Sequence, residues 1–254
     1  MSRINLYIHY DSVTNHIMTR GINLLSADFE ENYIPNHMIL ADAPAAFGRF
    51  DAQTNFKILR GQREVIDYLD ICHGEGMQLS NWIDFESISA MHNLTPNEIA
   101  EILYLFHASN TLRSAFFYKL QNNYVFLTLP NGLNKMYYRH AHHFYPRFRR
   151  VLRREMGELI NEGRNWFFMK KEKVSTFPQE LAERIAPLFV DGLKINFSQA
   201  SLREACWYVP LDIIEDELTL LTQSQVPSEH VGHLIYNTQT QLWVLEISMS
   251  ENDY

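Results

Sequence analysis

The stretch that decides the expected fold opens with Thr95-Pro96-Asn97-Glu98 and continues as IAEILYLF over residues 99–106. Thr95 and Glu98 have the spacing of a capping box, in which each side chain accepts the backbone N–H of the other residue. Pro96 suits the first position of a helix, where no N–H is needed. Ile102 and Phe106 belong to an apolar stripe that recurs at helical spacing. The pattern therefore predicts a helix with one buried face.

Similar signals stand on both sides of this helix. Residues 85–92 carry Phe85, Ile88 and Met91 on one predicted helical face, and residues 110–122 repeat the pattern in a third predicted helix. Residues 124–129 are rich in β-branched and aromatic side chains, and a return strand begins at 136. Pro130-Asn131-Gly132 lies between them, and Asn-Gly in such a place predicts a hairpin turn.

Three helices followed by a hairpin resemble a winged helix-turn-helix over residues 85–139, and residues 86–103 also resemble a helix-turn-helix pair. The resemblance implies that one helix reads nucleic acid. The turn of the pair has Asn93 where Gly is frequent, and the second helix would present Glu98 and Glu101 to a polyanion, which is repulsive. A role as a packing or dimerisation module is the alternative.

The rest of the chain predicts further helices and a small sheet. We expect helices over 12–25, 62–73, 178–189 and 211–221, and short strands and loops over 33–60. Strands over 4–10, 230–236 and 241–248 are expected to pair. The expected fold class is α+β, helix-rich, with a trihelical winged-helix-like middle and a small mixed or antiparallel sheet from the terminal segments. The expected segments are 1–84, 85–163 and 164–254, of which the first and last could form one domain.

Positive charge is concentrated in the middle of an acidic chain. The formal net charge is −8, yet residues 93–154 hold nine Lys and Arg against two Asp and Glu. The flanking segments 1–92 and 155–254 have net charges of −6 and −9. Such local asymmetry can guide the choice of binding partner.

A predicted helix that starts near Pro146 carries much of this charge. Its arginines lie off the apolar stripe and crowd the N-terminal half, where the helix dipole favours anions at about 0.3–1 kcal/mol per charge. Local helix stability therefore does not explain them, whereas an anionic partner does. The candidate nucleic-acid or anion-binding residues are Arg113, Tyr137, Arg139, His140, His142, His143, Arg147, Arg149, Arg150, Arg153 and Arg154.

Two simpler interpretations of the arginines remain open. They are either solvated or paired with the protein's own acidic residues, for which a predicted helical face holding Asp212 and Glu215 to Glu217 is a candidate. The three histidines lack a carboxylate or cysteine at a recognised spacing, so no metal and no cofactor are predicted.

The leading functional prediction is a nucleic-acid-associated protein, such as a transcriptional regulator, that binds through the arginine-rich helix. The alternatives are a scaffold that docks an acidic protein, and an enzyme acting on an anionic substrate, although no catalytic motif is present. The enzyme alternative predicts a deep pocket where Arg and His side chains converge. Cys72 and Cys206 lie far apart, which favours a reducing, cytoplasmic location. No apolar run has transmembrane length, so no membrane association is expected, and a homodimer stays open.

Overall fold

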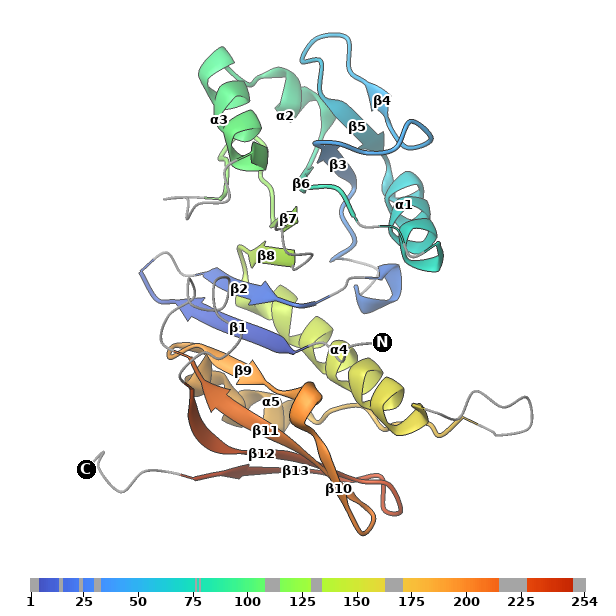
Figure 1. Ribbon diagram of the computed structural model, residues 1–254. Helices are drawn as coiled ribbons and strands as arrows, with labels where there is room; N and C mark the ends of the chain where they lie inside the picture. Colours follow the sequence, from blue (N-terminus) through green and yellow to red (C-terminus); the bar gives the residue numbers. More distant parts are fainter. Residues whose placement is uncertain are drawn as a thin grey trace. The chain divides into compact units, whose positions relative to one another are not determined.

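The computed structural model describes residues 5–13, 16–22, 25–29, 33–75, 77, 79–107, 115–128, 134–162, 171–214 and 228–248. Within these ranges the chain forms thirteen strands and five α-helices (Figure 1). It divides into two compact units. Unit 1 comprises residues 1–12 and 145–254, and unit 2 comprises residues 13–144.

Unit 2 is built on an antiparallel sheet. Its strand order is β2 (His16–Arg20), β8 (Asn134–Tyr138), β7 (Tyr124–Thr128), β6 (Trp82–Phe85), β3 (His37–Leu40), β5 (Lys57–Arg60) and β4 (Arg49–Phe50). All four residues of β6 are buried, and the Trp82 ring stacks on Phe126 of the neighbouring β7 at 5.7 Å. The middle of the sheet is therefore covered on both faces, which buries most side chains of these strands.

Three helices belong to unit 2, namely α1 (Gln62–Gly74), α2 (Ile88–His92) and α3 (Pro96–His107). In α1, Val65, Leu69 and Cys72 are buried, and the helix packs beside β3 and β5 (Figure 1). The capping box at the start of α3 is confirmed. The Thr95 N–H donates to Glu98 Oε2 at 2.7 Å, and the Glu98 N–H donates to Thr95 Oγ1 at 3.3 Å.

Unit 1 holds a second antiparallel arrangement. The order is β13 (Trp243–Ile247), β12 (Glu229–Asn237), β11 (Cys206–Ile213), β9 (Leu193–Ile195) and β1 (Leu6–Asp11), and β10 (Ser201–Arg203) also pairs with β11. Its helices are α5 (Gln179–Ile185) and most of α4 (Ala141–Asn161), whose first residues up to Phe144 belong to unit 2. Phe148 of α4 makes edge contacts with Phe177 and Phe189, and Phe177 contacts Trp243 of β13, so aromatic rings form part of this core. Short 3-10 helices lie at Ser26–Asp28, Ala186–Phe189 and Phe197–Gln199.

The expected fold class was wrong, because antiparallel strands dominate the architecture and the chain is not helix-rich. The trihelical middle fails at its third helix. Residues 115–122 form a bend and a turn, while residues 108–114 lie outside the described ranges. Asn122 supplies the physical reason. Its side chain accepts the Phe117 N–H at 2.8 Å and donates to the Ala115 carbonyl at 3.3 Å, so backbone groups bond to an amide rather than to a helical neighbour.

The predicted sheet was also wrong in size and position. The predicted hairpin is present as β7 and β8, although its turn at 129–133 lies outside the described ranges. These strands also pair with β6 and β2, so the hairpin lies inside the sheet and is not a projecting wing. The expected helix over 12–25 contains β2, whose residues Ile17 to Arg20 are all buried. A strand buried on both faces loses the alternation that distinguishes it from a helix.

Some of the other predicted helices and strands are confirmed, and others have different bounds or a different type. Helices at 62–73 and 178–189 and the hairpin of β12 and β13 are confirmed. The start of the helix predicted over 211–221 is instead the end of β11, and residues 215–227 lie outside the described part. α4 has the predicted buried stripe but begins at Ala141, five residues before Pro146. Among the described residues, no helix combines the length and apolarity that a membrane crossing requires.

Candidate functional site

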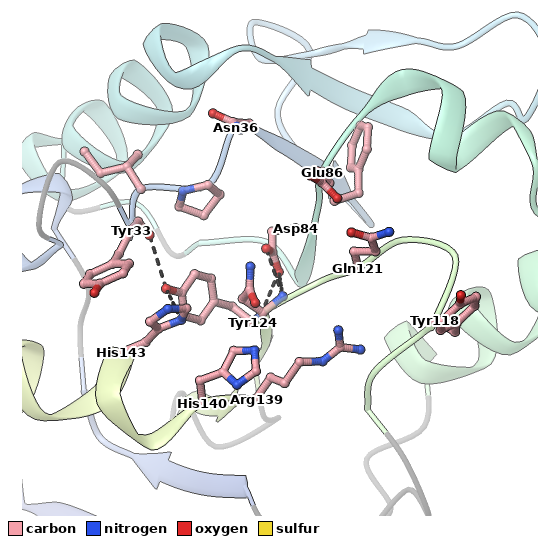
Figure 2. Close-up of a pocket in the computed structure, with 14 residues that line it drawn as sticks. Tyr33, Asn36, Asp84, Glu86, Tyr118, Gln121, Tyr124, Arg139, His140 and His143 are labelled. Carbon is pink, nitrogen blue, oxygen red and sulfur yellow. Dashed lines mark hydrogen bonds between the residues drawn. The ribbon is translucent and has the colours of Figure 1, made fainter.

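A pocket with a volume of about 570 Å³ lies within unit 2. One wall comes from residues 33–36 and from the end of β6 with the residue after it, which contribute Asp84 and Glu86. The facing wall comes from the junction between β8 and α4, which contributes Arg139, His140 and His143 (Figure 2). The size is within the usual range for pockets that enclose small molecules.

Asp84 is the buried carboxylate of this pocket, with 4% of its surface exposed. The ladder between β6 and β7 pairs Trp82 with Phe126 and Ile83 with Val125. At the next position the acceptor is the Asp84 side chain. Its carboxylate accepts the backbone N–H of Asn123 at 3.0 Å and of Tyr124 at 2.6 Å. Strand pairing therefore fixes the position of the carboxylate.

The protonation of Asp84 is set by opposing effects. Burial raises its pKa to about 7, because an ionised carboxylate is poorly solvated there. The two backbone N–H groups and the positive charge of Arg139 act in the opposite direction. Near neutral pH this carboxyl group can therefore either donate or accept a proton.

Arg139 follows β8 directly and is anchored on both its backbone and its side chain. Its N–H donates to the Asn123 carbonyl at 2.9 Å, and its guanidinium lies over the Phe116 ring, 5.2 Å from the centroid. Partial burial lowers its pKa, and Asp84 opposes this shift. A guanidinium positioned in this way at a pocket wall suits a carboxylate or phosphate group.

The imidazole of His143 is oriented by two tyrosines. The Tyr124 hydroxyl donates to the Tyr33 carbonyl at 3.2 Å and also lies 3.2 Å from His143 Nδ1. A hydroxyl has one proton and a carbonyl can only accept, so Nδ1 is the donor in its contact with Tyr124. In the neutral ring, Nε2 then carries the basic lone pair.

The other two histidines lie beside His143. The ring centroids of His140 and His142 are 5.2 Å and 4.3 Å from that of His143. Burial lowers the pKa of His140, and the charges of His142 and Arg139 lower it further. Of the three histidines, His140 and His143 line the pocket. Among the described residues, no group of three or more His, Cys, Asp or Glu side chains is arranged to hold a metal ion.

The remaining predicted binding residues do not converge on this pocket. Tyr137 is buried in β8, and Arg113 lies outside the described residues. In α4, Arg147 is buried, Arg150 is half-buried and Arg153 is exposed. The arginine-rich helix therefore does not present its cations as one solvent-facing surface.

Two further arginines of α4 are engaged within unit 1. Arg149 Nε donates to the Phe177 carbonyl at 2.6 Å, and Arg154 lies 3.4 Å from the Glu155 carboxylate. The acidic helical face that was predicted as an internal partner of the arginines is not a helix at Asp212. Asp212 is a strand residue that accepts from Asn196 at 3.1 Å and contacts His230 at 3.2 Å. Residues 215–217 lie outside the described part of the chain.

Several pocket residues were not singled out from the sequence, chiefly Tyr33, Asp84, Glu86, Gln121 and Tyr124. Asp84 had a usable signal, because it interrupts the otherwise apolar run Trp82-Ile83-Asp84-Phe85. A lone carboxylate in a buried strand is costly unless it is paired, and it is therefore a candidate for function. The other residues are ordinary polar and aromatic positions that only the fold brings together.

No family model matches this chain, and no curated protein and no solved structure is significantly similar to it.

Proposed function

We propose that this protein binds a small anionic molecule in the unit 2 pocket and transfers a proton to or from it. The observation that carries the proposal is the convergence of Arg139, His140 and His143 on one pocket that also contains the buried Asp84. An enzyme that acts on a small anionic substrate is expected to have such a pocket. A protein that binds a polyanion is instead expected to present its cations on an exposed surface.

The proposed roles follow from the chemistry of each group. Arg139 holds the anionic group, because a guanidinium donates several charge-assisted hydrogen bonds in a fixed plane. His143 accepts a proton through Nε2 when its ring is neutral, since Nδ1 donates to Tyr124. Asp84 is the second proton-exchanging group, because its pKa of about 7 leaves both protonation states accessible.

Isothermal titration calorimetry tests this proposal with pyrophosphate and succinate as probes. We expect binding of at least one probe, weakened about tenfold or more in Arg139→Gln, because the central cation is lost. Arg63→Gln is the matched control, since Arg63 is an exposed residue of α1 outside the pocket. Titration in two buffers with different ionisation enthalpies also measures the number of protons exchanged on binding.

The outcomes separate clearly. Binding that Arg139→Gln loses, with proton exchange that Asp84→Asn or His143→Gln alters, supports the proposal. Equal loss in Arg63→Gln contradicts it, as does no binding of any anionic or zwitterionic probe. Binding whose net proton exchange is the same in wild type, Asp84→Asn and His143→Gln retains the anion site and removes the proton-transfer role.

Nucleic-acid association through α4 stays a second proposal, in which the exposed Arg153 would contact the phosphates, since Arg147 is buried and Arg149 donates within unit 1. Fluorescence anisotropy with labelled duplex and single-stranded DNA across a salt series tests it. A steep salt dependence that Arg153→Glu reduces would support it.

A cytoplasmic location is part of the main proposal, since Cys72 and Cys206 are both free thiols.

A further inference from the structure

The charges of the pocket are separated onto facing walls. Asp84 and Glu86 come from the β6 side, whereas Arg139, His140 and His143 come from the β8–α4 side (Figure 2). Asp84 lies in the buried part of the pocket, and Glu86 is exposed at its edge. The pocket therefore offers a negative wall and a positive wall to one ligand.

A purely anionic ligand would satisfy only one of these walls. Its negative charge would be attracted by Arg139 but repelled by the Glu86 carboxylate and by Asp84 whenever that group is ionised. The negative wall can still accept hydrogen bonds. A carboxylate has about four lone-pair sites, and Asp84 uses some of these for the N–H groups of Asn123 and Tyr124.

We infer that the ligand is a small zwitterion, whose anionic group binds Arg139 and His140 while its protonated amine binds Glu86 and Asp84. This inference rests on the proposed function, because it assigns the remainder of the ligand whose anionic group that function requires. The anionic group is a carboxylate or a phosphate, since a guanidinium recognises both.

The rest of the lining is compatible with an amine. Tyr33 and Tyr124 line the pocket beside His143, with ring centroids 4.4 Å and 5.8 Å from its imidazole, and Phe85 lies between Asp84 and Glu86 in the chain. Aromatic faces attract a nearby ammonium group. Asn36 and Gln121 add amide oxygens that accept N–H groups. A metal ion fits the negative wall less well, because the described residues include no cluster of three ligating side chains.

The test compares zwitterions with analogues that lack only the amine. The pairs are phenylalanine with hydrocinnamate, glutamate with glutarate, and phosphoethanolamine with ethyl phosphate. Binding to the full-length protein is measured by calorimetry or by ligand-observed NMR. We expect the zwitterion of at least one pair to bind about tenfold more tightly than its amine-free partner.

Glu86→Gln isolates the negative wall, because Glu86 is exposed and its replacement is nearly isosteric. Because Asp84 remains, this variant is expected to reduce the preference for the zwitterion several-fold and to leave binding of the amine-free partner unchanged or stronger. Glu75→Gln, an exposed residue after α1, is the matched control and keeps the preference. Circular dichroism confirms that each variant is folded.

The result also separates this inference from the proposed function. One outcome is that amine-free anions bind as tightly as zwitterions in every pair, or bind while no zwitterion does. In that case the ligand is not a zwitterion, but the proposed anion-binding site is retained. If the zwitterion preference is undiminished in Glu86→Gln, the assignment of the amine to this wall is wrong. If no zwitterion and no anion binds, both the inference and the proposed function fail.

Discussion

The carboxylate of Asp84 accepts the backbone N–H of Tyr124 at 2.6 Å, and the hydroxyl of the same tyrosine lies 3.2 Å from His143 Nδ1. The first residue of β7 thus holds a buried acid with its main chain and orients an imidazole with its side chain. One residue of the sheet therefore contacts both of the groups that we propose to exchange protons.

The raised pKa of Asp84 predicts how stability depends on pH. In the folded protein the pKa of this group is about 7, whereas the ordinary pKa of an aspartate, which applies to the unfolded chain, is 3.8. Between these values the folded state binds more protons, so the free energy of unfolding falls as the pH rises. Asp84→Asn removes this contribution, and the difference between wild type and variant should change by up to about 1.4 kcal/mol per pH unit.

Urea denaturation at several pH values across this window measures the effect. Burial lowers the pKa of His37, His140 and His233, and these groups titrate in both proteins, so the comparison with the variant largely removes them. Asp42→Asn is the control, since Asp42 is exposed. A constant difference between wild type and Asp84→Asn across the window would contradict the raised pKa.

Removing the Tyr124 hydroxyl should change the tautomer of His143. Tyr124→Phe deletes the acceptor of the Nδ1 proton, so the ring is free to take the Nε2–H form that usually predominates in isolated histidine. The nitrogen-15 NMR shifts of the imidazole distinguish the two tautomers in wild type and variant. We expect a mostly Nδ1–H ring in wild type and a shift toward Nε2–H in the variant, with about 1 kcal/mol lost in stability.

Tyr104→Phe provides the comparison for this experiment, because Tyr104 is exposed on α3. It should leave the His143 signals in place. If Tyr124→Phe also left them in place, the hydroxyl would not determine the tautomer.

Gly232 is expected to tolerate no side chain. Its φ is +149°, and an added Cβ would lie 2.0 Å from the Glu246 carbonyl oxygen of the neighbouring β13. Gly232→Ala should therefore lower the free energy of unfolding by roughly 2 kcal/mol or more, because two backbones must separate. Chemical denaturation measures this loss.

At Gly74 the same substitution to alanine is expected not to lower stability. It lies in the last turn of α1, and no atom is within 4 Å of an added Cβ. Gly74→Ala should be neutral or stabilising by about 0.5–1 kcal/mol, because alanine favours the helix. Equal effects of the two substitutions would show that the β12–β13 contact is not close.

The arginines of α4 should differ strongly in their contribution to stability. Arg149→Ala removes the donor of a 2.6 Å hydrogen bond and leaves the Phe177 carbonyl without it, which should cost about 1–3 kcal/mol. Arg153→Ala alters an exposed side chain and should change stability by less than about 0.5 kcal/mol. Thermal or urea unfolding compares the two variants. Similar losses at both positions would contradict the distinct environments.

Local sequence signals correctly predicted several elements. The capping box of Thr95 and Glu98 predicted the start of α3, and the apolar stripe predicted the buried face of α4. These signals succeed because cap bonds and helical periodicity depend on residues within a few positions of each other. The third predicted helix failed because the Asn122 side chain bonds to the backbone of Ala115 and Phe117, a competition that periodicity does not reveal.

The sequence by itself determined the basic middle segment and marked Arg139, His140 and His143 as candidate anion-binding residues, because charge and residue type can be read directly. Only the tertiary structure decided that Asp84 faces these residues, since antiparallel pairing of β6, β7 and β8 brings together positions that are 55 residues apart in the chain. The same packing buries Arg147 and engages Arg149 with Phe177, so it removes part of the apparent arginine surface. Pairing between distant strands depends on burial over the whole sheet, and no local pattern encodes it.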